Sequence, residues 1–223
     1  MAAFSKLTRM RRLTHILMSP ACRLARLALG EKKLAHDLET AADPLSHLPV
    51  FTDLDGTQVT GVWAIVDCLE GLYPDYPLVP EDQAPRSEAL RLLDWAMSKF
   101  SEEVTRRILF EKASRSQTGN LLRQPPSMET IRQGRAALKE ALQMLGALAE
   151  ERGFLAGRDM SLADLALAAH LSALDYYGEV PWTDHPAMAE WYMRMKSRPS
   201  FRSLLMDRVP GQPPALQYAE LDF

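Results

Sequence analysis

The sequence has few of the residues that mark a secreted or membrane protein. It contains only two cysteines, Cys22 and Cys68, among 223 residues, too few for a framework of disulfides. Its most apolar stretch, 162–174, is interrupted by Asp164 and His170 and is shorter than the roughly 20 apolar residues that a membrane-spanning helix needs. We therefore predict a cytoplasmic protein that is not inserted into a membrane.

Sequence patterns typical of metal and nucleotide sites are also missing. The five histidines are not spaced as metal ligands, and the glycines near position 153 do not follow a strand as G-x-G-x-x-G. The 26 Lys and Arg against 29 Asp and Glu give a net charge of −3, which provides no overall attraction to nucleic acid. We therefore predict neither a metal site nor a nucleic-acid partner.

What the sequence does contain is the composition of a soluble globular protein, 47% apolar and 25% charged. Short apolar runs and two helical patterns up to residue 74 predict a small α/β domain, with strands at 13–18, 35–39, 49–51 and 58–60 and helices from 21 and over 62–72. Four prolines then indicate a linker, and apolar residues spaced three or four apart, from Leu90 through Phe100 to Ile108, predict that the rest is helical.

This pattern divides the chain into five segments. We expect a basic N-terminal arm, an α/β domain, a Pro-rich linker, an all-helical domain and a C-terminal tail, at residues 1–12, 13–74, 75–85, 86–206 and 207–223. Residues 1–33 carry eight Lys or Arg and a single acid, Glu31, a net charge of +7. Two interpretations of this basic region stay open: a surface for an acidic partner, or an ordinary solvated face.

Four motifs, in the same order along the chain, resemble the glutathione S-transferase family. They are Ser19-Pro20-Ala21-Cys22-Arg23, Leu48-Pro49-Val50-Phe51, the Phe154…Ser161-x-Ala163-Asp164 capping motif, and Pro186…Arg198-Pro199-Ser200-Phe201. The resemblance implies a thioredoxin-like N-terminal domain with a cis-proline at Pro49, followed by a C-terminal helical bundle. Apart from the resemblance, four tryptophans lie within helical or loop patterns of the sequence, and we expect them at core or interface positions: Trp63, Trp95, Trp182 and Trp191.

The resemblance further implies a glutathione site, of which this sequence keeps only remnants. In the family, a backbone beside the cis-proline pairs with glutathione, here through Val50, and an acidic residue followed by serine holds its γ-glutamyl end. Gly61 and Val62 stand at those last two positions. Each missing charge-assisted hydrogen bond removes roughly 1.5–3 kcal/mol. We therefore expect a degenerate site and no cofactor.

The position of the family's reactive residue leaves two enzymatic alternatives. Ser19 stands where related enzymes place a catalytic serine or cysteine, so the first alternative is a glutathione S-transferase in which Ser19 stabilises the thiolate of glutathione. The second is a thiol redox protein acting through Cys22, near a helix N-terminus. We favour a Cys22 that packs as a small apolar residue, because free cysteines are usually buried. Ser19 and Cys22 are then vestigial, and no catalytic residue is assigned.

The C-terminal tail combines prolines with large apolar residues around an acid. One interpretation is a segment that packs on its own helical domain, which accounts for Leu216 and Tyr218; the other is a binding segment, because Leu221-Asp222-Phe223 places two large apolar groups at the end. The ending resembles the FtsZ-binding cell-division members of the family in alphaproteobacteria. That resemblance implies a non-enzymatic homodimer at the division site that binds FtsZ filaments and bundles or curves them. We expect Tyr218, Leu221, Asp222 and Phe223 to contact FtsZ.

Overall fold

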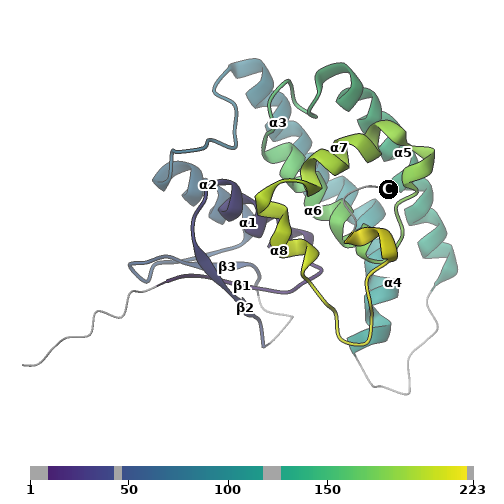
Figure 1. Cartoon of the computed structure of the whole chain (residues 1–223), viewed down its shortest axis with the longest axis horizontal. Helices are drawn as coiled ribbons and strands as arrows, with labels where there is room; N and C mark the ends of the chain where they lie inside the picture. Colours follow the sequence, from purple (N-terminus) through teal and green to yellow (C-terminus); the bar gives the residue numbers. More distant parts are fainter. Residues whose placement is uncertain (1–9, 43–46, 118–126, 220–223) are drawn as a thin grey trace, which may run out of the picture.

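The computed structural model describes residues 10–42, 47–117 and 127–219. Their first part forms a four-stranded mixed sheet with the strand order β2-β1-β3-β4 (Figure 1). The strands are β1 (Arg11–His15), β2 (His36–Thr40), β3 (Val50–Thr52) and β4 (Gln58–Thr60). Strand β1 is parallel to β2 and antiparallel to β3, and β3 is antiparallel to β4.

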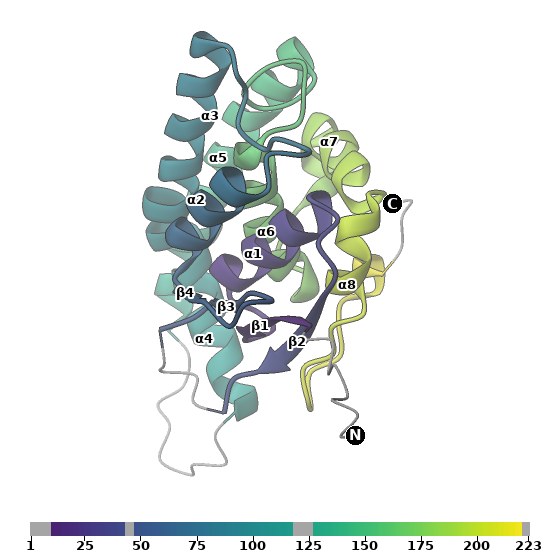
Figure 2. The ribbon, with the colours of Figure 1, turned by 90° about the vertical axis from the view of Figure 1, so that its left-hand side faces the viewer.

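Two helices complete the α/β domain, α1 (Pro20–Glu31) and α2 (Val62–Leu72), and they pack against each other. The predicted thioredoxin-like arrangement is confirmed, and Figure 2 shows both helices between the sheet and the helical domain. The hydroxyl of Ser19 begins α1, since it accepts a hydrogen bond from the Cys22 backbone N–H at 3.4 Å. Pro20 stands in the first turn, where a missing N–H costs no helical bond.

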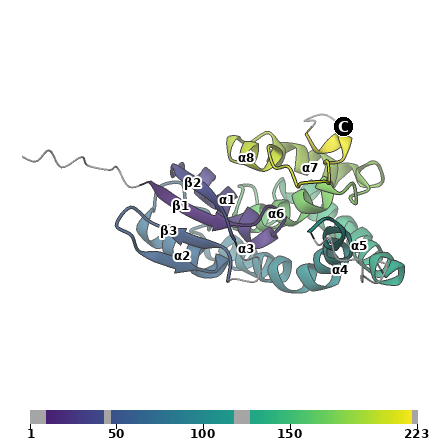
Figure 3. The ribbon, with the colours of Figure 1, turned by 90° about the horizontal axis from the view of Figure 1, so that it is seen from below.

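Helices make up most of the remaining described residues. The longer helices are α3 (Gln83–Trp95), the π-helical segment η1 (Ala96–Thr105), α4 (Arg106–Gln117), α5 (Met128–Arg152), α6 (Leu162–Tyr176) and α7 (Pro186–Lys196). They are followed by the short helix α8 (Arg202–Leu205). Three 3₁₀ turns, η2 (Trp182–Asp184), η3 (Pro199–Phe201) and η4 (Leu216–Tyr218), lie among and after them. Figure 3 shows this helical domain beside the sheet, with α6 and α1 where the two domains meet.

Helix α6 forms the centre of the molecule, and every one of its residues is buried. Its predicted capping motif is confirmed: Asp164 accepts hydrogen bonds from the Ser161 backbone N–H at 2.9 Å and from the Trp191 indole at 3.0 Å. Burial raises the pKa of the Asp164 carboxyl, although hydrogen bonds from Leu155, Ser161 and Trp191 oppose the rise. Small residues on α6 let α1 approach closely, which joins the two domains.

One local expectation is wrong, the bounds of the first strand. Strand β1 covers Arg11–His15, so Arg11 and Arg12 belong to the sheet rather than to the arm, and its pairing with β2 ends at His15. Leu90 lies in helix α3, where it is 41% exposed. Trp63 is 49% exposed in the first turn of α2, so it is not a core residue, and the alternative of an interface position stays a prediction.

Among the described residues, we find no helix with the length and apolar character needed to cross a membrane. The same residues contain no group of three or more His, Cys, Asp or Glu side chains arranged to hold a metal ion.

Candidate functional site

The remnants of the predicted glutathione site lie around the start of β3 and α2. The Leu48–Pro49 peptide bond is cis, as the resemblance implied, and the Pro49 carbonyl accepts a hydrogen bond from the Gly61 N–H at 2.8 Å. Val50 lies between Thr14 of β1 and Thr60 of β4 in the sheet register. Gly61 has a φ of 89° and precedes α2 with no side-chain cap, so neither it nor Val62 presents a polar side chain there.

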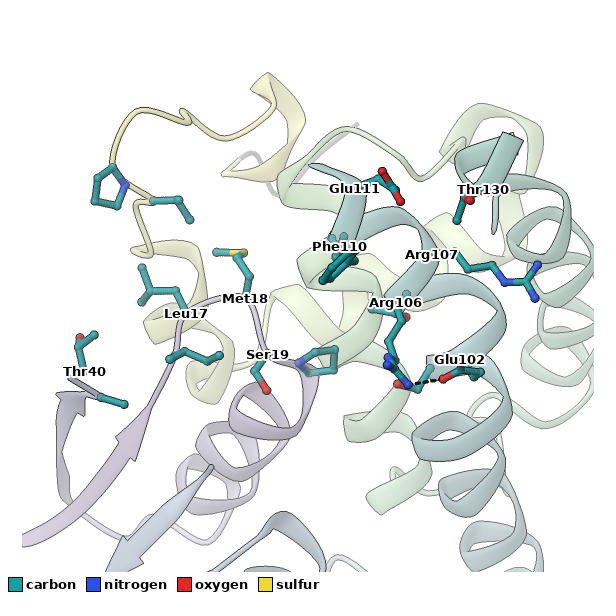
Figure 4. Close-up of a pocket in the computed structure, with 18 residues that line it drawn as sticks. Leu17, Met18, Ser19, Thr40, Glu102, Arg106, Arg107, Phe110, Glu111 and Thr130 are labelled. Carbon is teal, nitrogen blue, oxygen red and sulfur yellow. Dashed lines mark hydrogen bonds and ion pairs between the residues drawn. The ribbon is translucent and has the colours of Figure 1, made fainter. Parts of the chain in front are cut away.

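A cleft of about 680 Å³ opens beside Ser19, between the α/β domain and the helical domain. Residues 16–20 and 40–41 form one wall, and residues 101–111 of η1 and α4 with Thr130 form the opposite one. Figure 4 shows Leu17 and Met18 on the first side and Phe110 on the second. Val209 and Pro210 complete the rim. Of the predicted site residues, the cleft therefore includes Ser19, whereas Pro49, Val50, Gly61 and Val62 are not among its lining residues.

The two cysteines differ in exposure. Cys22 is fully buried in α1, and this burial raises the pKa of its thiol, although hydrogen bonds from Ile16 and Ser19 oppose the rise. This complete burial agrees with the expected packing of Cys22 as a small apolar residue, and a raised thiol pKa makes a cysteine a poorer nucleophile. Burial also raises the pKa of the half-buried Cys68, helped by the charge of Asp53.

His170 is a core residue in α6, as its apolar surroundings suggest. Its Nδ1 lies 2.9 Å from the hydroxyl of Thr105, which lines the cleft, and Phe100 packs edge-on against its ring. Complete burial lowers the pKa of His170 to about 3, so the imidazole is neutral at physiological pH.

A buried cluster of charged residues joins α1 to the C-terminal segment. Asp207 accepts two hydrogen bonds from Arg26, at 2.8 and 2.9 Å, and one from Arg23 at 3.0 Å. Arg23 is 0% and Arg26 is 2% exposed, and Lys32 is buried nearby in sequence. The interpretation of residues 1–33 as one basic surface is therefore wrong for these three side chains, which are paired or hydrogen-bonded inside the molecule.

Tyr218 anchors the tail on this cluster. Its ring is 0% exposed and packs against Tyr176 at 5.1 Å between ring centroids. The hydroxyl donates to the Leu204 carbonyl at 2.6 Å and accepts from the Arg23 guanidinium at 3.2 Å. The expectation that Tyr218 contacts a partner is wrong in this conformation, because its ring is buried and its hydroxyl is hydrogen-bonded within the same chain.

Leu216 and Ala219, on either side of that anchor, are exposed. Leu216 is 89% exposed, so the interpretation that it packs on the helical domain is wrong. The other predicted contact residues, Leu221, Asp222 and Phe223, lie outside the described residues.

Sequence reasoning missed Asp207, although the sequence holds a signal for it. Arg23 and Arg26 stand three residues apart in a helix whose other side chains up to Leu29 are apolar, and buried cations need a partner. The partner is more than 180 residues away along the chain, and it comes close because the C-terminal segment that begins with η3 packs on α1.

Comparisons with known proteins identify the family to which this architecture belongs. Residues 128–194 match the family model "Glutathione S-transferase, C-terminal domain". The chain is 42% identical, over 96% of its length and 98% of the relative's, to "FtsZ-localized protein A" of Caulobacter vibrioides.

Solved structures agree with the sequence comparison. "FzlA from C. crescentus" superposes with a TM-score of 0.89 and 41% identity, covering 96% of this chain and 100% of that one. A glutathione S-transferase from Rhodospirillum rubrum F11 gives a TM-score of 0.90 and 39% identity, with the same coverage. Because the fold, the cis-proline, the central capping motif and these identities agree, this chain belongs to the glutathione S-transferase family and, within it, to the FzlA-like group.

Proposed function

We propose that this protein is a non-enzymatic cell-division protein that binds FtsZ filaments through its C-terminal tail. The observation that carries the proposal is the Tyr218 anchor. It fixes the chain on Arg23 and Leu204 immediately before Leu221, Asp222 and Phe223. The name of the relative, FtsZ-localized protein A, supports FtsZ as the partner.

Anchoring next to a recognition segment has a physical advantage. A segment that is fixed at one end loses less conformational entropy on binding than a free one does. In this proposal Leu221 and Phe223 insert apolar side chains, and Asp222 sets their register by a polar contact. A homodimer presents two such tails, so it engages neighbouring subunits or two filaments at once, and bundles or curves them by avidity.

The degenerate glutathione site supports the non-enzymatic part of the proposal. The start of α2, which in the family's pattern supplies a carboxylate and a hydroxyl, here offers Gly61 and Val62. Two absent charge-assisted bonds weaken binding by roughly 3–6 kcal/mol together. Pro49 and Val50 do not line the cleft beside Ser19.

Cosedimentation with polymerised FtsZ tests the tail. We expect Leu221→Lys and Asp222→Lys to abolish the pelleting of this protein with filaments, without changing its helicity or its oligomeric state. Leu54→Lys is a matched control, because Leu54 is an exposed leucine in the β3–β4 turn. If the two tail variants pellet like the wild type, the tail does not bind FtsZ.

A second candidate function is glutathione transfer with Ser19 as the thiolate-stabilising residue. The observation in its favour is the position of Ser19 at the N-terminus of α1 and in the wall of the cleft. It predicts submillimolar glutathione binding by calorimetry and a conjugation rate that Ser19→Ala diminishes. Our proposal predicts no measurable binding in the same titration.

A further inference from the structure

Strand β2 is an edge of the sheet, and its outward side is open. The order β2-β1-β3-β4 leaves β2 with β1 as its one neighbour among the described strands (Figure 1). Residues 37–40 are exposed, and His36 is half-buried. The unpaired N–H and C=O groups of an open edge are a template for pairing with a strand of another chain.

The backbone groups on this open side can be assigned residue by residue. The Ala41 N–H donates to the His15 carbonyl of β1 at 2.9 Å. Successive residues of a strand direct their N–H and C=O groups to opposite edges, so Asp37 and Glu39 point towards β1 as Ala41 does. The groups of the other three residues point away from the sheet, those of His36, Leu38 and Thr40.

Strand β2 lacks features that usually block an edge. The five residues His36–Thr40 contain no proline and no lysine, and their register with β1 runs without a bulge. Leu38 stands opposite Leu13 of β1. Leu13 is fully buried, whereas Leu38 is 40% exposed, because it has a neighbouring strand on one side only. An added strand would cover Leu38.

The acidic side chains of β2 determine the charge of a strand that fits. Asp37 and Glu39 alternate with Leu38, so they lie on the opposite face of the sheet from the core. Arg12 of β1 pairs with Glu39 at 3.2 Å rather than with Asp37, its neighbour in the register. Asp37 is therefore exposed with no ion pair to another described residue, and a basic side chain on an added strand would be its first counter-charge.

The same acids disfavour a second copy of β2 as the added strand. If two β2 strands paired in antiparallel fashion about Leu38, Asp37 would lie opposite the second copy's Glu39. Like charges directly opposite each other destabilise a pair of strands, whereas opposite charges stabilise it. The pattern that fits this edge is therefore a basic, an apolar and a basic residue in succession, with the apolar residue beside Leu38.

We propose that the open edge of β2 binds an extended basic segment of a partner protein by strand addition. The segment runs antiparallel to β2, the slightly more stable pairing, and places an apolar residue opposite Leu38 between two basic residues. In this mode of binding, backbone hydrogen bonds provide the affinity and alternate side chains provide the specificity. The surface includes no residue of the C-terminal tail, and the proposal does not rest on FtsZ binding.

The probe is a rhodamine-labelled peptide of sequence VRVRV, with both ends blocked, in a fluorescence anisotropy titration of the full chain. We expect saturable binding that weakens as the salt concentration rises. The peptide VEVEV should bind at least about fivefold more weakly, because both of its charged residues would then face acids. No saturable binding of VRVRV, or equal affinities for the two peptides, would overturn the proposal.

Two N-methylated forms of VRVRV test the strand pairing without changing the protein. With the central valine opposite Leu38 in an antiparallel pair, the N–H of this valine points to β2 and the N–H of each arginine points away. A methyl group on the valine nitrogen should weaken binding at least about tenfold, and one on an arginine nitrogen less than about threefold. Equal losses, or the reverse order, would overturn the proposed pairing.

A charge reversal on the protein locates the peptide. Asp37→Lys should weaken VRVRV binding at least about threefold. Glu140→Lys is the matched control, since Glu140 is an exposed acid on α5, and it should bind the peptide like the wild type. Equal affinities of the two variants would place the peptide elsewhere and overturn the proposal.

Hydrogen exchange gives a second location that does not depend on charge. Bound VRVRV should slow exchange at the outward amides and leave those of Asp37 and Glu39, which already point to β1, unchanged. The outward amides are those of His36, Leu38 and Thr40. Unchanged exchange at these three amides would contradict binding at the edge.

The chain's own basic N-terminus is the competing occupant. Residues 1–9 contain Lys6 and Arg9 and no acid. A chain that begins at Met10 should bind VRVRV with the affinity of the full chain. Peptide binding that occurs only in the shortened chain would assign the edge to residues 1–9 and overturn the proposal of a partner protein.

Discussion

Removing the Asp207 carboxylate should destabilise the fold more than removing any exposed carboxylate. Asp207→Ala leaves two buried guanidiniums, Arg23 and Arg26, without their shared counter-charge. Removing one partner of a buried ion pair costs about 3–5 kcal/mol. For a chain of this size, each kcal/mol lowers Tm by roughly 2–4 °C, so we expect Tm to fall by about 6–20 °C.

The control for this prediction is an exposed ion pair of the same chemistry. Arg12 and Glu39 form a 3.2 Å pair on the sheet with both side chains more than half exposed. Exposed pairs contribute about 0–1 kcal/mol, so Glu39→Ala should lower Tm by at most about 4 °C. Thermal unfolding followed by circular dichroism measures both variants. If Asp207→Ala unfolds within the range of Glu39→Ala, the cluster does not hold the C-terminal segment as we infer.

Three further predictions concern stability and reactivity. The stability of the fold should fall as the pH is lowered from 6.5 towards 5. Burial lowers the folded-state pKa of His15 to about 4 and that of His170 to about 3, so the unfolded chain binds more protons than the folded one in this range. Equal urea midpoints at pH 7.5 and pH 5.5 would contradict this prediction. Thiol labelling of the native protein should modify the half-buried Cys68 before the buried Cys22, and mass spectrometry of the labelled peptides would show the reverse order if Cys22 were reactive. Gly30→Ala should destabilise the protein, since the new Cβ would lie 2.8 Å from the Cβ of Ser200. Gly71→Ala is the control, because its Cβ meets no atom within 4 Å, and it should be neutral or stabilising in chemical denaturation. Equal denaturation midpoints for the two variants would refute the close approach of α1 and η3.

The features that could be predicted from the sequence are local ones. Ser161 and Asp164 stand three residues apart before an apolar run, which is enough to begin a helix in this context. Asp55-Gly56 is a pair typical of a hairpin turn, and Gly56, between β3 and β4, has a φ of 93°. The cis peptide bond at Pro49 followed from the family resemblance rather than from local chemistry.

The features that escaped prediction depend on contacts between distant parts of the chain. Arg23 and Asp207 are 184 residues apart, and no periodicity links them. The burial of Tyr218 and the exposure of Leu216, two residues apart in η4, depend on how that turn sits on α6 and α8. The cleft likewise combines residues near 17, 106 and 210, which only the packed domains bring together.

The most direct test of the account is cosedimentation of FtsZ filaments with a chain that ends at Ala219. This variant keeps Tyr218 and its bonds to Arg23 and Leu204, and it removes only residues 220–223. We predict the Tm of the full-length protein and no pelleting with FtsZ. Pelleting equal to that of the full-length protein would contradict the claim that the end of the tail recognises the filament.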